Sequence, residues 1–269
     1  MANGPTKADP ALQMTDDELT VERARARMVG LASVLTVAMF SGFIFTTWLA
    51  LKDSSGGTNA KKLEAIADHK LAFVFSSFFF SIASLLVAAV LVHLILAARS
   101  RSTLVPKLAL YAAIAGPVLA AIVYPAYTLA QVSAANKFAD APAQTAKVAQ
   151  DLLNSNTIEF TTTLYLFAQL LVAIAWVMTG MYCMRLGLLT RLVGSVAIAI
   201  GLANLIAPPL AALLQVFWIG SIAIMLLGEG PQTPPAWKLG RPVTWREVAA
   251  LGASGPASES PSDFKKSDQ

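Results

Sequence analysis

The sequence predicts an all-α integral membrane bundle of six transmembrane helices, with both termini in the cytoplasm. Of its 269 residues, 56% are hydrophobic and only 13% are charged, and the mean hydropathy is +0.61. A soluble domain carries about 25% charged residues, so this chain lacks the side chains needed to cover a water-facing surface. Six spans of about 21 residues need about 126 apolar residues, which the composition supplies. A soluble two-domain enzyme, a disordered chain and, with a single cysteine, a disulfide scaffold are excluded.

Six apolar stretches are long enough, or nearly so, to cross a bilayer: residues 28–51, 71–98, 108–133, 160–184, 192–207 and 210–227. The first is too long for the apolar region of a signal peptide and has no clear cleavage site, so we expect it to be retained. The fifth is short, and only Pro208 and Pro209 separate it from the sixth. These two stretches are expected to form a tight helical hairpin of two spans, and a re-entrant pair is the alternative.

The basic residues set the expected orientation, because cytoplasmic loops carry an excess of lysine and arginine. With the N-terminus inside, 14 of the 20 basic residues, including all nine arginines, fall on the cytoplasmic side. The short connections 99–107 and 185–191 have the greatest weight, since long loops are translocated largely regardless of charge. Both termini are therefore placed in the cytoplasm.

This topology divides the chain into a cytoplasmic N-terminal segment (1–27), a membrane domain (28–228) and a cytoplasmic tail (229–269) that is rich in proline and serine and is expected to be largely disordered. Thr15 and Glu18 have the spacing of a capping box, which predicts that a helix begins there. Trp237 and Trp245 are expected to anchor the tail at the inner headgroup layer.

Two segments on the predicted outer side have helical periodicity. In residues 59–70, apolar side chains recur at helical spacing, and residues 142–153 can start a helix at a proline. Each is expected either to lie along the membrane surface or to extend the neighbouring span.

Chemically reactive groups are scarce in the spans. An ionisable side chain at mid-membrane costs about 2.5 to 3.5 kcal/mol, and no Asp, Lys or Arg lies well within a span, which disfavours a carboxylate-relay pump. His69 and His93 are expected on one continuous helix, about 36 Å apart, too far to bind one metal or haem within a subunit. Cys183 has no second cysteine with which to form a redox pair. No catalytic residue, metal site or cofactor is predicted, and an enzyme is the less favoured class.

Polar side chains gather in the outer half of the spans. The candidate ligand-binding residues are Tyr124, Tyr127, Gln131, Glu159, Gln169, Asn204 and Gln215. Polar groups in hydrocarbon seek partners, so we expect these side chains to converge. Interhelical hydrogen bonds are the favoured interpretation. The alternative is an outward-facing cavity beside the third, fourth and fifth helices, which Pro117 and Pro125 would widen by kinking the third.

Small residues recur on two helices at spacings that allow close packing. They are Ser77, Ser81, Ser84 and Ala88 on the second predicted span, and Gly194, Ala197 and Gly201 on the fifth. These faces are candidate surfaces for association with a copy of the chain or with another membrane subunit.

The stretch 180–195, GMYCMRLGLLTRLVGS, ends a span in a short basic turn and begins a glycine-containing helix. Together with the start of the first span at 23–30, it resembles multi-pass bacterial membrane families classed as domains of unknown function. The resemblance covers roughly residues 23–227. It implies a six-helix bundle in a bacterial plasma membrane, and it supplies no activity.

The sequence therefore favours a non-catalytic structural or accessory membrane protein that associates through its small-residue faces. The alternative is a carrier or binding protein for an uncharged or lipid-like ligand. The expected partners are the lipid bilayer and a copy of the chain or a membrane complex. Nucleic acid is not expected, because the net charge of +4 reflects topology.

Overall fold

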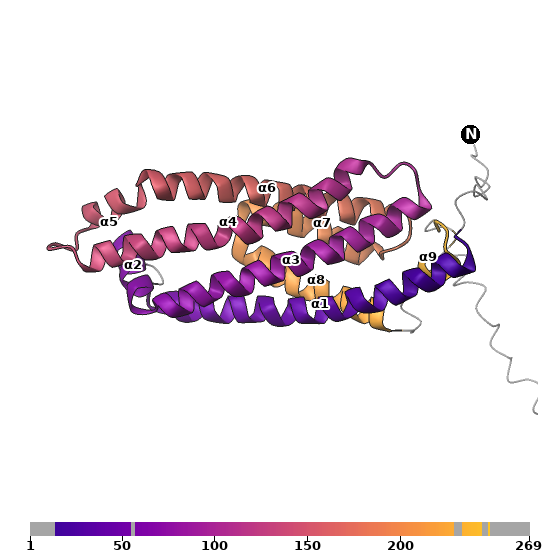
Figure 1. The fold of residues 1–269 in the computed structure, drawn as a ribbon, viewed down its shortest axis with the longest axis horizontal. Helices are drawn as coiled ribbons and strands as arrows, with labels where there is room; N and C mark the ends of the chain where they lie inside the picture. The colour runs from indigo at the N-terminus through magenta and orange to yellow at the C-terminus, as the bar shows by residue number, and fades with distance from the viewer. Residues whose placement is uncertain (1–13, 55–56, 229–232, 244–246, 248–269) are drawn as a thin grey trace, which may run out of the picture.

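A computed structural model describes residues 14–54, 57–228, 233–243 and 247, and these residues form helices without a strand. The α-helices are α1 (Asp16–Leu51), α2 (Asn59–Asp68), α3 (Lys70–Arg101), α4 (Lys107–Ala139), α5 (Ala146–Leu153), α6 (Asn156–Arg185), α7 (Arg191–Ile206), α8 (Pro208–Leu227) and α9 (Pro235–Leu239), and a single 3-10 turn, η2, covers Lys52–Ser54. The predicted all-α class is confirmed (Figure 1).

Five helices, α1, α3, α4, α6 and α8, are long and apolar enough to cross a membrane. Their length and composition indicate a multi-pass membrane protein. The remaining apolar helix, α7, has 16 residues. At 1.5 Å per residue it is about 24 Å long, shorter than the hydrocarbon core of about 30 Å. The sixth span and the location of the termini therefore stay predictions.

The long helices α1, α3, α4 and α6 run lengthwise along the molecule, and α7 and α8 lie at one end of it (Figure 1). We call this the arginine end: α1 begins there, and α3 and α6 finish there. Every arginine among the described residues belongs to the helix ends and connections at this end. The opposite end carries α2 and α5 (Figure 1).

Two apolar cores fill the bundle. The main core includes Trp176 of α6 and Trp218 of α8, whose ring centroids lie 4.7 Å apart in an edge-to-face arrangement. A second, smaller core lies at the end opposite the arginines, where Leu63 and Ile66 of α2 are fully buried together with Phe138 of α4. The short helices α2 and α5 thus extend the bundle instead of lying apart from it.

Glycines allow the closest helix contacts. A Cβ added at Gly116 of α4 would lie 2.7 Å from the backbone nitrogen of Val172, and one added at Gly180 of α6 would lie 2.6 Å from the carbonyl oxygen of Gly194. The small-residue face of α7 therefore packs on α6 within the same chain. On α3, the Ser81 hydroxyl donates a 2.8 Å hydrogen bond to the Ala121 carbonyl of α4. Both predicted small-residue faces are thus used inside the bundle.

The helix starts follow their sequence signals closely. Thr15 and Glu18 form the predicted capping box at the beginning of α1. Both predicted outer helices are present, although α5 begins at Ala146, where the Thr145 side chain accepts a hydrogen bond from Val148 N–H, and not at the earlier proline. Pro117 and Pro125 lie inside α4, which continues through both.

One expectation about the histidines was wrong. His69 does not share a continuous helix with His93, because its backbone, at φ −117° and ψ 32°, leaves the helical conformation between α2 and α3. Only His93 belongs to α3. The chain can therefore redirect α2 toward α4 while α3 runs on through the bundle.

Candidate functional site

The seven predicted ligand-binding residues separate into three places. Glu159 lies in the first turn of α6 and is exposed, away from the others. Gln169, Asn204 and Gln215 are buried around one internal cavity. Tyr124, Tyr127 and Gln131 lie along α4 in an aromatic cluster. The structure thus brings six of the seven residues together in two adjoining groups, which meet at Phe80: this side chain lines the cavity, and its ring lies 4.3 Å from that of Tyr124.

Gln169, Asn204 and Gln215 come from α6, α7 and α8, respectively. The Gln215 Nε2 donates a 3.2 Å hydrogen bond to the Asn204 Oδ1, and the Asn204 Nδ2 donates a 3.0 Å bond to the Ile200 carbonyl. The centre of a water molecule placed in the cavity that they line can move within about 20 Å³. A volume of about 10 to 15 Å³ on this measure admits one water molecule, so the cavity is water-sized.

The aromatic cluster contains a member that the sequence did not indicate, Tyr165 of α6. Its ring stacks on Tyr127 at 5.4 Å and lies 5.4 Å from Tyr124, whose ring in turn lies 4.3 Å from Phe80. Tyr165 was missed because it lies within a strongly apolar stretch. Its spacing of four residues from Gln169, the same as that of Tyr127 from Gln131, was the available signal.

Each tyrosine of this cluster has a polar partner. Ser76 lies beside Tyr124, Gln131 beside Tyr127, and Gln169 beside Tyr165. The Gln131 Oε1 and the Thr128 hydroxyl are buried without a hydrogen-bond partner within the described structure. Orphaned buried acceptors and donors are uncommon, and they mark a place where water or a polar ligand group can bind.

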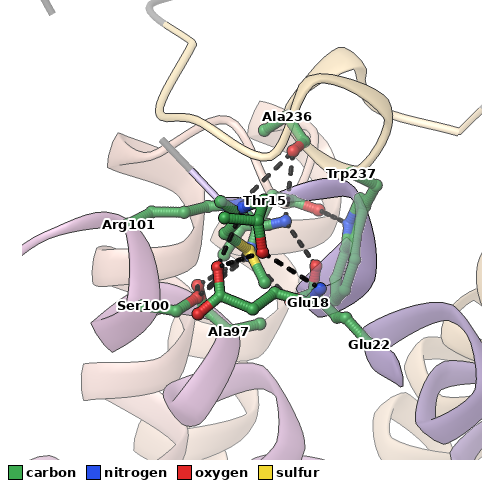
Figure 2. Close-up of polar contacts among 10 residues, drawn as sticks. Thr15, Glu18, Glu22, Ala97, Ser100, Arg101, Ala236 and Trp237 are labelled. Carbon is green, nitrogen blue, oxygen red and sulfur yellow. Dashed lines mark hydrogen bonds and ion pairs between the residues drawn. The ribbon is translucent and has the colours of Figure 1, made fainter. Parts of the chain in front are cut away.

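The strongest polar site lies at the arginine end and centres on Arg101, at the last position of α3. Its guanidinium is fully buried and donates to both carboxylate oxygens of Glu22 on α1 at 2.7 Å (Figure 2). It also donates to the carbonyl oxygens of Ala236, at 3.2 and 3.3 Å, and of Ala97, at 2.9 Å. A buried charge is costly unless it is paired and hydrogen-bonded, and Arg101 meets both conditions.

Glu22 had a signal that sequence reasoning missed. It falls on the buried stripe of α1 formed by Leu19, Ala26 and Gly30, where the helical period places an apolar side chain. A carboxylate on such a stripe requires a cationic partner. The partner itself, on another helix, could not be identified from spacing.

Trp237 of α9 completes this cluster. Its indole ring lies under the Arg101 guanidinium, with 5.4 Å between Cζ and the ring centroid, and stacks on His93 at 5.7 Å. The indole N–H donates a 2.9 Å hydrogen bond to the Leu188 carbonyl in the α6–α7 connection. Trp237 is only 8% exposed, so the expected anchor in the headgroup layer is instead a contact within the protein. We call Glu22, His93, Arg101, Ala236 and Trp237 the Arg101 cluster.

Further bonds hold the segment 233–243 against the bundle. Val243 N–H donates to the Leu186 carbonyl at 3.3 Å, and Met14 N–H donates to the Gly240 carbonyl at 3.2 Å. Gly187, in the same connection as Leu186, has φ +71°, a conformation that favours glycine. This part of the predicted tail is therefore packed on the protein. Residues 229–232, 244–246 and 248–269 of that tail lie outside the described residues, as do residues 1–13 of the N-terminal segment.

Two pockets flank Glu22. One, of about 410 Å³, lies between α1 and α3 and includes Arg25, His93 and Ser100. The other, of about 390 Å³, lies between α1, the end of α8 and the segment 233–243. Both are large enough for part of a ligand, unlike the internal cavity.

The metal-ligating residue types do not gather in the described part of the chain, where no three His, Cys, Asp or Glu side chains come within reach of one ion. Cys183 is fully buried, and its Sγ lies 3.5 Å from the Leu94 carbonyl.

Comparisons with protein-family models, with curated proteins and with solved structures found no match.

Proposed function

We propose that this chain is a non-catalytic structural or accessory subunit of a bacterial plasma membrane, crossing it six times with both termini in the cytoplasm. Here α7 is the sixth span, pairing with α8 as a short hairpin. The α7–α8 hairpin lies at the arginine end. In this topology the arginine end faces the cytoplasm, as the excess of basic residues there favours. The other four long helices extend past the hairpin on the outer side.

The hydrogen bond between Gln215 and Asn204 carries this proposal. Two of the candidate binding residues are bonded to each other across the α7–α8 hairpin, around a cavity that has room for a water molecule. Amides used in this way hold helices together. A closed, internally bonded interior supports a structural role better than it supports carriage of a lipid-sized ligand.

The surface for association is α1. In its most apolar stretch of 18 residues, 22% of the residues are buried, compared with 50% in the corresponding stretches of α3 and α4. Leu31, Leu35 and Phe45 of α1 are exposed. Because the small-residue faces are used inside the bundle, α1 is the span with the most apolar surface left for a partner in addition to lipid.

Cross-linking tests this role. The single native cysteine is buried, so a Cys183→Ser background makes introduced cysteines the only reactive thiols. With Leu31→Cys or Leu35→Cys, we expect disulfide-linked copies, or a linked second subunit, after mild oxidation in native membranes. Leu166→Cys on α6, at an equally exposed position, is the matched control. Monomers only, with every variant and in native mass spectrometry, would contradict the proposal.

The carrier remains the second candidate because of one observation, the unpaired Gln131 Oε1 and Thr128 hydroxyl beside the tyrosine cluster. A polar ligand group reaching this place would satisfy both. Gln131→Leu should then abolish ligand binding while leaving the fold intact. If Gln131→Leu changes only thermal stability, the tyrosine cluster is a packing element.

A further inference from the structure

The pocket between α1, the end of α8 and the segment 233–243 combines cations with apolar side chains. Its basic residues are Arg23 and Arg27, one turn apart on α1, and Lys238 on α9. Its apolar side is formed by Met225, Leu226 and Leu227, the last residues of α8. From this arrangement we propose that the pocket binds the phosphate headgroup of an anionic membrane lipid.

The charge of the pocket favours an anion. Among its described lining residues, Glu22 is the only carboxylate, and its charge is already neutralised by two 2.7 Å hydrogen bonds from Arg101. Arg23 and Lys238 are both exposed, so their charged groups can reach a phosphate. Arg23 comes from α1 and Lys238 from α9. Because these are separate elements, the two cations can approach one phosphate together, which scattered surface lysines do not.

The apolar side selects a lipid over a soluble phosphate compound. Leu227 is 40% exposed, and it lies where the apolar helix α8 ends. In the proposed topology, this is the level where headgroups meet hydrocarbon. A phosphate held by Arg23 and Lys238 would leave its acyl chains running along α8 toward the bilayer. Basic pockets of this kind between helices suit anionic headgroups. The pocket volume of about 390 Å³ accommodates a headgroup with the first part of its chains.

This inference goes beyond the proposed subunit role and needs only that the arginine end lies at a membrane surface. A bound lipid would contact α1 and α9 at once. It would therefore help to hold the segment 233–243 on the bundle.

Native mass spectrometry of the full chain tests this pocket. The protein, purified in a neutral detergent, is titrated with phosphatidylglycerol, with phosphatidylcholine and with inorganic phosphate. We expect one phosphatidylglycerol to bind more tightly than phosphatidylcholine, and inorganic phosphate not to compete at equal concentration. In Arg23→Gln/Lys238→Gln, binding should weaken about 25-fold, since each basic residue near an anionic surface contributes a factor of about five.

Lys107→Gln/Arg185→Gln is the matched control. It removes the same charge from exposed positions at the same end of the bundle, outside the pocket. Equal weakening in the two double variants would show a diffuse charge effect and overturn the proposal. Equal binding of both lipids, or full competition by inorganic phosphate, would overturn it as well.

A second measurement on the unmodified chain covers the case in which the double variant fails to fold. Photoactivatable phosphatidylglycerol should cross-link to peptides containing 225–228 or 233–238. Cross-links confined to other helices would contradict the proposal. Because both measurements detect lipid on single copies, they do not depend on whether the chain associates with a partner.

Discussion

The guanidinium of Arg101 donates two 2.7 Å hydrogen bonds to the carboxylate of Glu22, although the two residues are 79 positions apart in the sequence. The pair joins the first turns of α1 to the last turn of α3, and the Ala236 carbonyl adds α9 to the same guanidinium. One side chain therefore ties together both ends of the described chain. We therefore expect the stability of the arginine end to depend on this side chain.

Removing one member of this pair should cost more than removing both. Arg101→Met leaves the Glu22 carboxylate buried without a cation, and we expect a loss of about 3 to 5 kcal/mol in unfolding free energy. The double variant Glu22→Leu/Arg101→Met removes the orphaned charge and should recover a large part of this loss. Thermal unfolding in detergent, followed by circular dichroism, measures both. Additive effects of Glu22→Leu and Arg101→Met would contradict the coupling.

Trp237 should control access to the segment 233–243. Trp237→Ala removes the indole hydrogen bond to Leu188 and the ring contacts with Arg101 and His93, so the segment should detach from the bundle more often. We expect trypsin to cleave after Lys238 several times faster in this variant. Trp48→Ala is the control, because Trp48 is 59% exposed and lies at the other end of α1. Unchanged cleavage in Trp237→Ala would show that other bonds hold the segment.

The Asn204–Gln215 bond should act on stability. Asn204→Leu leaves the Gln215 amide buried without its acceptor, and we expect a loss of about 1 to 3 kcal/mol. Asn204→Leu/Gln215→Leu should lose less than the sum of the two single variants, because no partner is left orphaned. A double-mutant cycle of thermal unfolding measures this. Strictly additive losses would show that Asn204 and Gln215 do not stabilise the protein through their mutual hydrogen bond, and would contradict the prediction.

Lys62 gives a pH-dependent prediction outside the spans. Burial in α2 lowers the pKa of Lys62, so the folded state disfavours its charged form. The unfolded chain then binds more protons between the lowered pKa and the ordinary value near 10.4, and stability rises with pH across that window. Lys62→Met should therefore raise the melting temperature at pH 7, with a smaller gain near pH 10. The neighbouring, exposed Lys61→Met should have little effect at either pH.

Local sequence signals predicted the elements of the fold well. Hydropathy located the apolar helices, apolar periodicity located α2 and α5, and the Thr15–Glu18 spacing located the start of α1. These features depend on residues within one or two turns of each other, which is why the sequence reveals them. The ends of the long helices were less accessible, as α4 shows: it continues to Ala139, past residue 133, where its predicted span ends.

The long-range contacts could not be predicted in the same way. The pairing of Arg101 with Glu22 and the burial of Trp237 depend on how distant segments meet, and a tryptophan after an apolar span equally suits a headgroup anchor. Likewise, the convergence of Asn204 with Gln215 was expected, but the water-sized volume of their cavity depends on packing by Phe40 and Trp176. Composition alone does not determine such packing.

The accessibility of introduced cysteines in intact cells tests the proposed orientation of the bundle in the membrane most directly. In a Cys183→Ser background, the exposed positions Thr103, at the arginine end, and Ala143, at the opposite end, are each replaced by cysteine. A membrane-impermeant maleimide should modify Ala143→Cys in intact cells and Thr103→Cys only after the membrane is opened. Modification of Thr103→Cys in intact cells would place the arginine end outside and contradict the proposed topology.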